Sequence, residues 1–256
     1  MTLPDLEQIV AGVTFTGVRV GGLMVFAPFT SSDSIAAPVK AVLALLITAV
    51  VYPMTNIVGI RSDAVGWFGI AAGEAVIGLA LGLLLQFSFE AVQFAGQICG
   101  IQTGFSLVTL LDPQTEADSP SLVVFMQLMA FVAFLQLNIH HWILRGVTAS
   151  FAYLPPGSLH HLSRMSGGVL AAAGRLWLAG LQIAAPVLAV TVLIDVTLGF
   201  LGKVAPQFPA TLAGLPVKNA VGLGVLAIAA RAWPHFFEHE FTLVITQAEK
   251  LLHVAA

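Results

Sequence analysis

The stretch Lys203–Lys218, KVAPQFPATLAGLPVK, separates two apolar runs that are each long enough to cross a bilayer. It holds three prolines, a glycine, a glutamine and two lysines where a lipid-embedded helix would otherwise continue. Proline removes an amide donor from the helical ladder, and a lysine is costly to place in hydrocarbon. Such backbone persists at membrane depth only where protein buries it or where it borders a wet cavity. The stretch therefore predicts a functional segment inside a membrane protein assembly.

The composition is that of an integral membrane protein. Apolar residues make up 58% of the 256 positions and charged residues 9%, against roughly a quarter charged in ordinary soluble domains. The net charge of −3, with basic residues scattered singly, argues against a nucleic-acid partner. The lone cysteine, Cys99, excludes an intrachain disulfide and is expected to be a small buried side chain.

The hydropathy pattern predicts an all-α membrane protein with about six apolar helical segments in one membrane-embedded domain, residues 1–256. Two of the segments are too long for a single crossing, and each is expected to be a bent helix or a hairpin. The tail 235–256 is amphipathic and predicts a packed or interfacial helix. The six segments are 9–29, 39–60, 66–101, 121–144, 169–201 and 211–233.

Several of these segments carry polar side chains and regularly spaced glycines. Glycines four residues apart, such as Gly78 and Gly82, let helix backbones approach closely in lipid. They serve either packing within this chain or contacts with other subunits. Intramembrane charged groups need partners or water, so they mark either internal pairing or an ion pathway. The charged residues in question are Arg19, Glu74, Glu90 and Asp195.

Enzymatic chemistry is not expected, and neither is a cofactor or a metal. His235, Glu238 and His239 fit the H-x-x-E-H pattern of inverted zinc proteases, but a short motif is weak evidence. Polar residues at a membrane–water boundary explain the same residues, and this explanation is favoured. The doublet His140-His141 closes an apolar run and is typical of an interfacial belt. The chain contains no nucleophile elbow, P-loop or dinucleotide-binding fingerprint.

Taken together, the motifs resemble one family, the FliR/SctT-type export-gate subunits of flagellar and type III secretion systems. The resemblance covers nearly the whole chain and depends on the order and spacing of its pieces. Its most specific piece is Ala205-Pro206-Gln207 with Gly214-Leu-Pro216-Val-Lys218. The other pieces are Arg19 with Met24–Pro28, Pro38–Lys40, Gly73-Glu74 with Gly78 and Gly82, Ala95-Gly96, Gly104–Ser106 leading to Asp112-Pro113, His140-His141 with Ser150-Phe151 and Pro155–Gly157, and Pro186 with Asp195 and Leu198-Gly199.

The resemblance implies one subunit of a helical complex in the bacterial inner membrane, at the flagellar basal body. The expected partners are FliP-like and FliQ-like membrane subunits and a FlhB-like subunit, which together form a pore for unfolded export substrates. Lys203, Pro206, Gln207, Gly214, Pro216 and Lys218 are expected to contact other subunits or to satisfy local helix ends. The family's pore plug corresponds to Gly104, Phe105, Ser106, Leu107, Val108, Leu110, Leu111, Asp112 and Pro113.

Two alternatives stay open. One is the injectisome homologue of the same subunit, although the His-His and Pro-Gln patterns favour the flagellar type. The other is a self-sufficient transporter of small solutes or protons that uses Glu74, Glu90 and Asp195.

Overall fold

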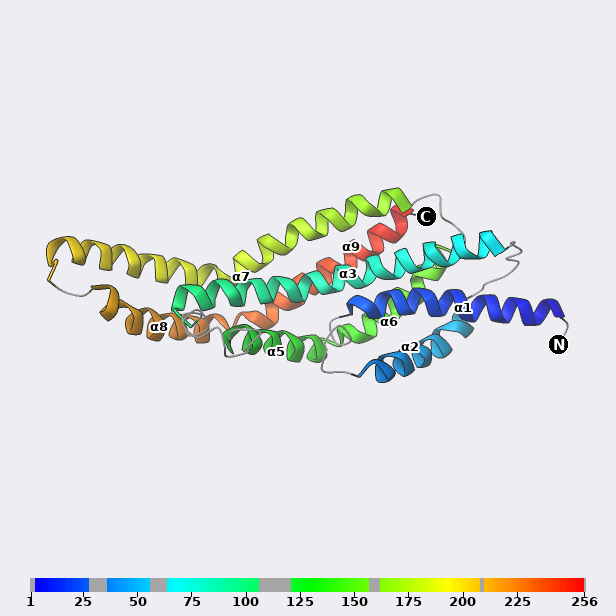
Figure 1. Cartoon of the computed structure of the whole chain (residues 1–256), viewed down its shortest axis with the longest axis horizontal. Coiled ribbons are helices and arrows are strands. Elements are labelled where there is room, and N and C mark those ends of the chain that lie inside the picture. Colours follow the sequence, from blue (N-terminus) through cyan, green and yellow to red (C-terminus); the bar gives the residue numbers. More distant parts are fainter. Residues whose placement is uncertain are drawn as a thin grey trace. The chain divides into compact units, whose positions relative to one another are not determined.

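Helices account for the regular structure throughout the described part of the chain (Figure 1). The computed structural model describes residues 3–27, 36–55, 64–105, 121–156, 162–207 and 210–255, and within them side chains at 7–27, 36–53, 55, 65–105, 121–156, 167–207 and 214–247. The predicted all-α class is confirmed. The helices are α1 (Leu3–Phe26), α2 (Ala37–Val51), the short 3-10 turn η1 (Tyr52–Met54), α3 (Ala64–Thr103), α5 (Ser121–Gln136), α6 (Ile139–Tyr153), α7 (Leu162–Val204), α8 (Ala210–Ala229) and α9 (Trp233–Ala255).

By length and composition, the described helices contain three candidate membrane spans. They lie in α1, α3 and α7, and the number rises to five if the bent pairs α5–α6 and α8–α9 each count as one span. The long segments 66–101 and 169–201 are continuous helices of 40 and 43 residues, not internal hairpins. Pro186 lies inside α7 without ending it. At 1.5 Å per residue, α7 is about 64 Å long, roughly twice the thickness of a hydrocarbon core.

In the described residues, the apolar segment 39–60 does not form one membrane-length helix. Helix α2 has 15 residues and ends at Val51, so it is about 22 Å long and too short for a simple crossing. Pro53 follows in the 3-10 turn, and Thr55 is already extended with φ −96° and ψ 114°. Proline has no amide hydrogen with which to continue the helical hydrogen bonds. The helix therefore ends before Pro53, although the residues around it are apolar.

The chain forms two compact units. The first consists of Met1–Ser88, Asn138–Gly174 and Phe241–Ala256, and the second of Phe89–Leu137 and Arg175–Glu240. This division by contacts does not test whether the chain is one membrane-embedded domain, so the predicted single domain, 1–256, stays a prediction.

The first unit is built around α1. Its buried residues Val20, Leu23, Met24 and Ala27 follow the i, i+3, i+4, i+7 spacing of one helix face. They pack against α3 and α6, and α2 runs alongside α1 (Figure 1). The residues that α3 and α6 contribute are Ile77, Ala80, Leu81, Val147 and Phe151.

Glycines bring α1 and α3 into backbone contact. A Cβ added at Gly22 would lie 2.8 Å from the carbonyl oxygen of Ala75, and one at Gly82 would lie 2.6 Å from that of Leu23. A Cβ at Gly78 would overlap the carbonyl oxygen of Arg19. Of the two roles considered for the glycine ladder, Gly78 and Gly82 serve packing within this chain.

In the second unit, α7 and α8 form an antiparallel hairpin that packs on the end of α3. Gly214 lies against Leu198, and Gly222 lies against Thr191 and Thr103. From Gly214 to Gly222 the residue numbers rise along α8, whereas the residues that face them on α7 fall from Leu198 to Thr191. The two helices are therefore antiparallel. Nearer the start of this unit, Gly96 of α3 packs on Val123 and Met126 of α5, and Phe94 meets Trp177 edge-on at 4.6 Å between ring centroids.

Substitution at Gly78 tests the contact of α1 with α3. We expect Gly78→Ala to destabilise the protein by about 1–3 kcal/mol, because its methyl group must push the two backbones apart. Gly21→Ala is the matched control, since a Cβ there meets nothing within 4 Å. Thermal unfolding in detergent measures both, and equal midpoints for the two variants would contradict the close approach.

Candidate functional site

A buried ion pair joins α1 to α3 in the first unit. Arg19 Nε donates to Glu74 Oε2 at 2.6 Å, and the side chains of the two residues are 0% and 2% exposed. A buried pair of this kind persists only where the geometry is good and further hydrogen bonds satisfy both partners.

The remaining donors of Arg19 are directed to α6. Nη1 donates to the Ser150 hydroxyl at 2.9 Å, and Nη2 donates to the Leu154 carbonyl at 2.8 Å. The hydroxyl of Ser150 in turn donates to the carbonyl of Val147 at 2.7 Å. The Phe151 ring covers the guanidinium, with Cζ 3.9 Å from the ring centroid. Arg19 thus ties three helices together and its charge is satisfied on every side.

Sequence reasoning selected Arg19 and Glu74 without pairing them with each other, and it missed the part that α6 plays. Ser150 and Phe151 stood out only as parts of a family pattern. A guanidinium has five N–H donors, and one carboxylate cannot accept from all of them. A buried arginine is therefore a signal that further acceptors must lie around it. Which acceptors do so depends on how α6 packs.

A second ion pair lies on the α7–α8 hairpin. Lys218 Nζ donates to Asp195 Oδ2 at 2.8 Å, with the lysine 15% and the aspartate 49% exposed. Lys218 therefore has a partner inside the chain. Gly214 lies one turn before Lys218 and is buried. The side chain of Leu198 covers it and occupies the space that a Cβ would take.

The helix break in the Lys203–Lys218 stretch is shorter than the sequence suggests. Helix α7 ends at Val204 and α8 already begins at Ala210, so Pro216 lies inside a helix. A proline costs a helix one hydrogen bond, which the rest of α8 tolerates. At the tip, Lys203, Pro206 and Gln207 are exposed, and Lys203 stands in the last turn of α7, where a cation complements the helix dipole.

Of the predicted plug, only its first two residues are described. Gly104 follows α3 with φ 87°, a conformation that glycine adopts at little cost, and its amide donates to the Ile101 carbonyl at 3.2 Å. Phe105 lies next to it in the same turn. Residues Ser106–Pro113 lie outside the described residues. Glu90, the remaining intramembrane carboxylate, is half-buried and already engaged in an interaction.

The histidine motif shows no metal-site geometry in the described residues. His235 Nδ1 is 3.9 Å from Glu238 Oε2, and both side chains are well exposed. Within the described ranges, no group of three His, Cys, Asp or Glu side chains is placed to hold a metal.

Comparison with known proteins decides the family. The family model described as "Bacterial export proteins, family 1" matches residues 10–244. The chain belongs to this family. It is similar to the flagellar biosynthetic protein FliR of Escherichia coli K12, with 33% identity over 88% of this chain and 86% of that protein. FliR of Pectobacterium carotovorum is 31% identical over 94% and 92%, and FliR of Bacillus subtilis 168 is 32% identical over 72% of each. The predicted FliR-type membership is confirmed.

The two ion pairs of this export-family chain differ in burial, and this difference gives a prediction. We expect Glu74→Gln to destabilise the protein by about 3–5 kcal/mol, because it leaves Arg19 buried beside a neutral group. Asp195→Asn is the matched control, for which we expect about 0–1 kcal/mol because the carboxylate is half exposed. The loss of monodisperse protein on heating in detergent measures both.

A double variant separates pairing from packing. Replacing Arg19 and Glu74 together by methionine should cost less than Glu74→Gln alone, since no buried charge remains. A double variant that is less stable than the single one would contradict this account.

Proposed function

We propose that this chain is the FliR-type subunit of a flagellar protein export gate in the bacterial inner membrane. Family membership is the observation that carries the proposal. The three relatives reported above are all flagellar by name, which favours the flagellar system over an injectisome. The candidate spans in α1, α3 and α7 support a place in a membrane.

In this proposal the chain is a structural subunit and not an enzyme, and it assembles with FliP-like, FliQ-like and FlhB-like membrane subunits. The hairpin of α7 and α8 supports such assembly. The candidate span in α7 is only 22% buried, and Leu193, Phe200 and Val204 are among its exposed apolar residues. The same hairpin carries Asp195, Lys203 and Lys218, which lipid would solvate poorly. A protein partner satisfies both the apolar and the polar groups.

The ion pairs favour a structural role over a self-sufficient transporter. A proton or ion pathway needs carboxylates that can change their partners or their charge. Glu74 is enclosed with Arg19, and Asp195 is paired with Lys218. Glu74 is therefore fixed where α1 packs on α3, and Asp195 already has a cation as its partner.

Co-expression tests the assembly. We expect the chain alone to lose monodispersity in detergent at a clearly lower temperature than the chain co-expressed with FliP-like and FliQ-like subunits. Exchange of Phe200 and Val204 for glutamine should reduce co-purification of the partners at least tenfold, since it makes the proposed contact surface polar. Leu170→Gln is the matched control, because Leu170 is similarly exposed near the start of α7, far along the helix from Thr191 and Leu198, which face α8. A monodisperse single chain that moves a solute unaided would overturn the proposal.

We further propose that the segment Gly104–Pro113 closes the pore, with Gly104 as its flexible start. Its residues Phe105, Leu107, Val108, Leu110 and Leu111 are apolar, which suits a segment that seals a passage. Deletion of 106–111 should make the assembled complex leaky to ions and small solutes. Planar-bilayer conductance of the complex measures this, and a deletion variant with the conductance of the parent complex would contradict the role.

A further inference from the structure

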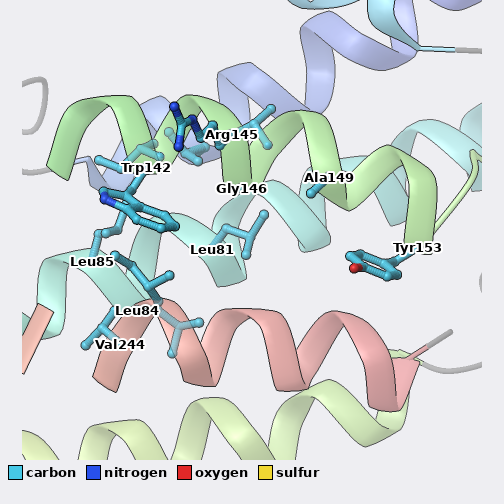
Figure 2. A pocket seen from close by; sticks show the side chains of 13 residues that line it. Leu81, Leu84, Leu85, Trp142, Arg145, Gly146, Ala149, Tyr153 and Val244 are labelled. Carbon is cyan, nitrogen blue, oxygen red and sulfur yellow. The ribbon is translucent and has the colours of Figure 1, made fainter. Parts of the chain in front are cut away.

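An apolar cavity of about 150 Å³ lies in the first unit between α3, α6 and α9. Figure 2 shows Leu81, Leu84 and Leu85 of α3 on one side, Val244 of α9 below them, and α6 above. Trp142 and Arg145 lie toward one end of the cavity and Tyr153 toward the other (Figure 2). All three of these side chains are exposed, so the cavity is open to the outside at its edge.

The lining suits a hydrocarbon chain. Leucine, isoleucine and valine side chains form most of the wall, and the backbone of Gly146 forms part of the α6 side. A cavity of this size and lining gives water too few polar partners, and it takes up apolar molecules instead. In a membrane the nearest apolar molecules are lipid acyl chains.

The edge of the cavity carries a positive charge. Among the described residues no carboxylate forms an ion pair with Arg145, and its guanidinium lies 5.7 Å from the centroid of the Trp142 ring. Arginine forms charge-assisted hydrogen bonds with phosphate, and its stem packs on apolar surface while the charge reaches the headgroup region. Tryptophan is enriched at that same level of a membrane.

We propose that this cavity binds a short segment of one acyl chain of an anionic phospholipid whose phosphate group pairs with Arg145. The cavity selects hydrocarbon and the guanidinium selects the negative headgroup, so that neither feature alone defines the ligand. The cavity and Arg145 belong to this chain, so the inference itself needs only that the chain lies in a membrane. Its test uses the complex of the proposed function, and a failure of that complex to form is seen at purification, before any lipid is added.

Quenching of Trp142 fluorescence by brominated lipid measures occupancy directly. The complex with its partner subunits is reconstituted in phosphatidylcholine nanodiscs that contain a minority of either dibromo-phosphatidylglycerol or dibromo-phosphatidylcholine. The signal of Trp142 is the difference between the complex with Trp142 and one with Trp142→Phe. We expect about fivefold preference for the glycerol lipid, as one cation near an anionic headgroup gives.

Two variants separate the headgroup contact from the cavity. Arg145→Gln should bring the two lipids to equal quenching, whereas Arg231→Gln, which removes an exposed cation outside the cavity, should leave the preference unchanged. Gly146→Leu should reduce quenching by both lipids, because a side chain there meets open space and fills the cavity. Gly174→Leu is its control, since Gly174 does not line the cavity.

Three outcomes overturn the proposal. Equal quenching by the two lipids in the parent complex means solvation by hydrocarbon without headgroup recognition. A preference that survives Arg145→Gln means that another cation provides it. Absence of quenching by both lipids in the parent complex means that a protein subunit fills the cavity.

Discussion

The first unit depends on the burial of one positive charge. An arginine inside an apolar bundle is tolerated only when its charge and its donors are all met, and Arg19 meets them with Glu74, Ser150 and the Leu154 carbonyl. These acceptors come from α3, from α6 and from the residue that follows α6. The guanidinium therefore determines which faces of α1, α3 and α6 must meet. Apolar contacts alone would fix the relative rotation of the three helices less strictly. Leu23, Leu81 and Val147 then pack around the pair as the hydrophobic part of the same contact.

Small residues make that contact possible. Arg19 reaches Glu74 because Gly22, Gly78 and Gly82 allow α1 and α3 to touch backbone to backbone. Hydrocarbon gives no hydrophobic driving force between helices, so close packing and polar contacts must hold them together. Here the close backbone packing and the ion pair act at the same contact of α1 with α3. The second unit uses the same principle with less burial. Gly214 and Gly222 bring α8 against α7, and Asp195 with Lys218 forms an ion pair at the hairpin surface.

This difference in burial suits a subunit that is shaped partly by its neighbours. A fully enclosed network holds the first unit together from within, whereas the hairpin leaves apolar residues such as Phe200 and Val204 uncovered beside charged ones. In the proposed export gate, the surfaces of other subunits complete the hairpin. The cavity beside Trp142 and Arg145 is a third type of surface, which the lipid in our inference completes.

The amino-acid sequence by itself determined the all-α membrane class, the family, and the residues at which polarity is out of place. It did so because hydropathy and glycine spacing are local properties that need no knowledge of packing. The sequence did not reveal where α2 ends, since the residues that follow Val51 are still apolar. It also overstated the break at Lys203–Lys218, since Pro216 is accommodated inside α8. Only the tertiary structure decided that Arg19 pairs with Glu74 and is bound by α6, that Lys218 pairs with Asp195, and that an apolar cavity opens beside Arg145. Those contacts join residues up to 135 positions apart in the chain, and no local pattern encodes such pairings.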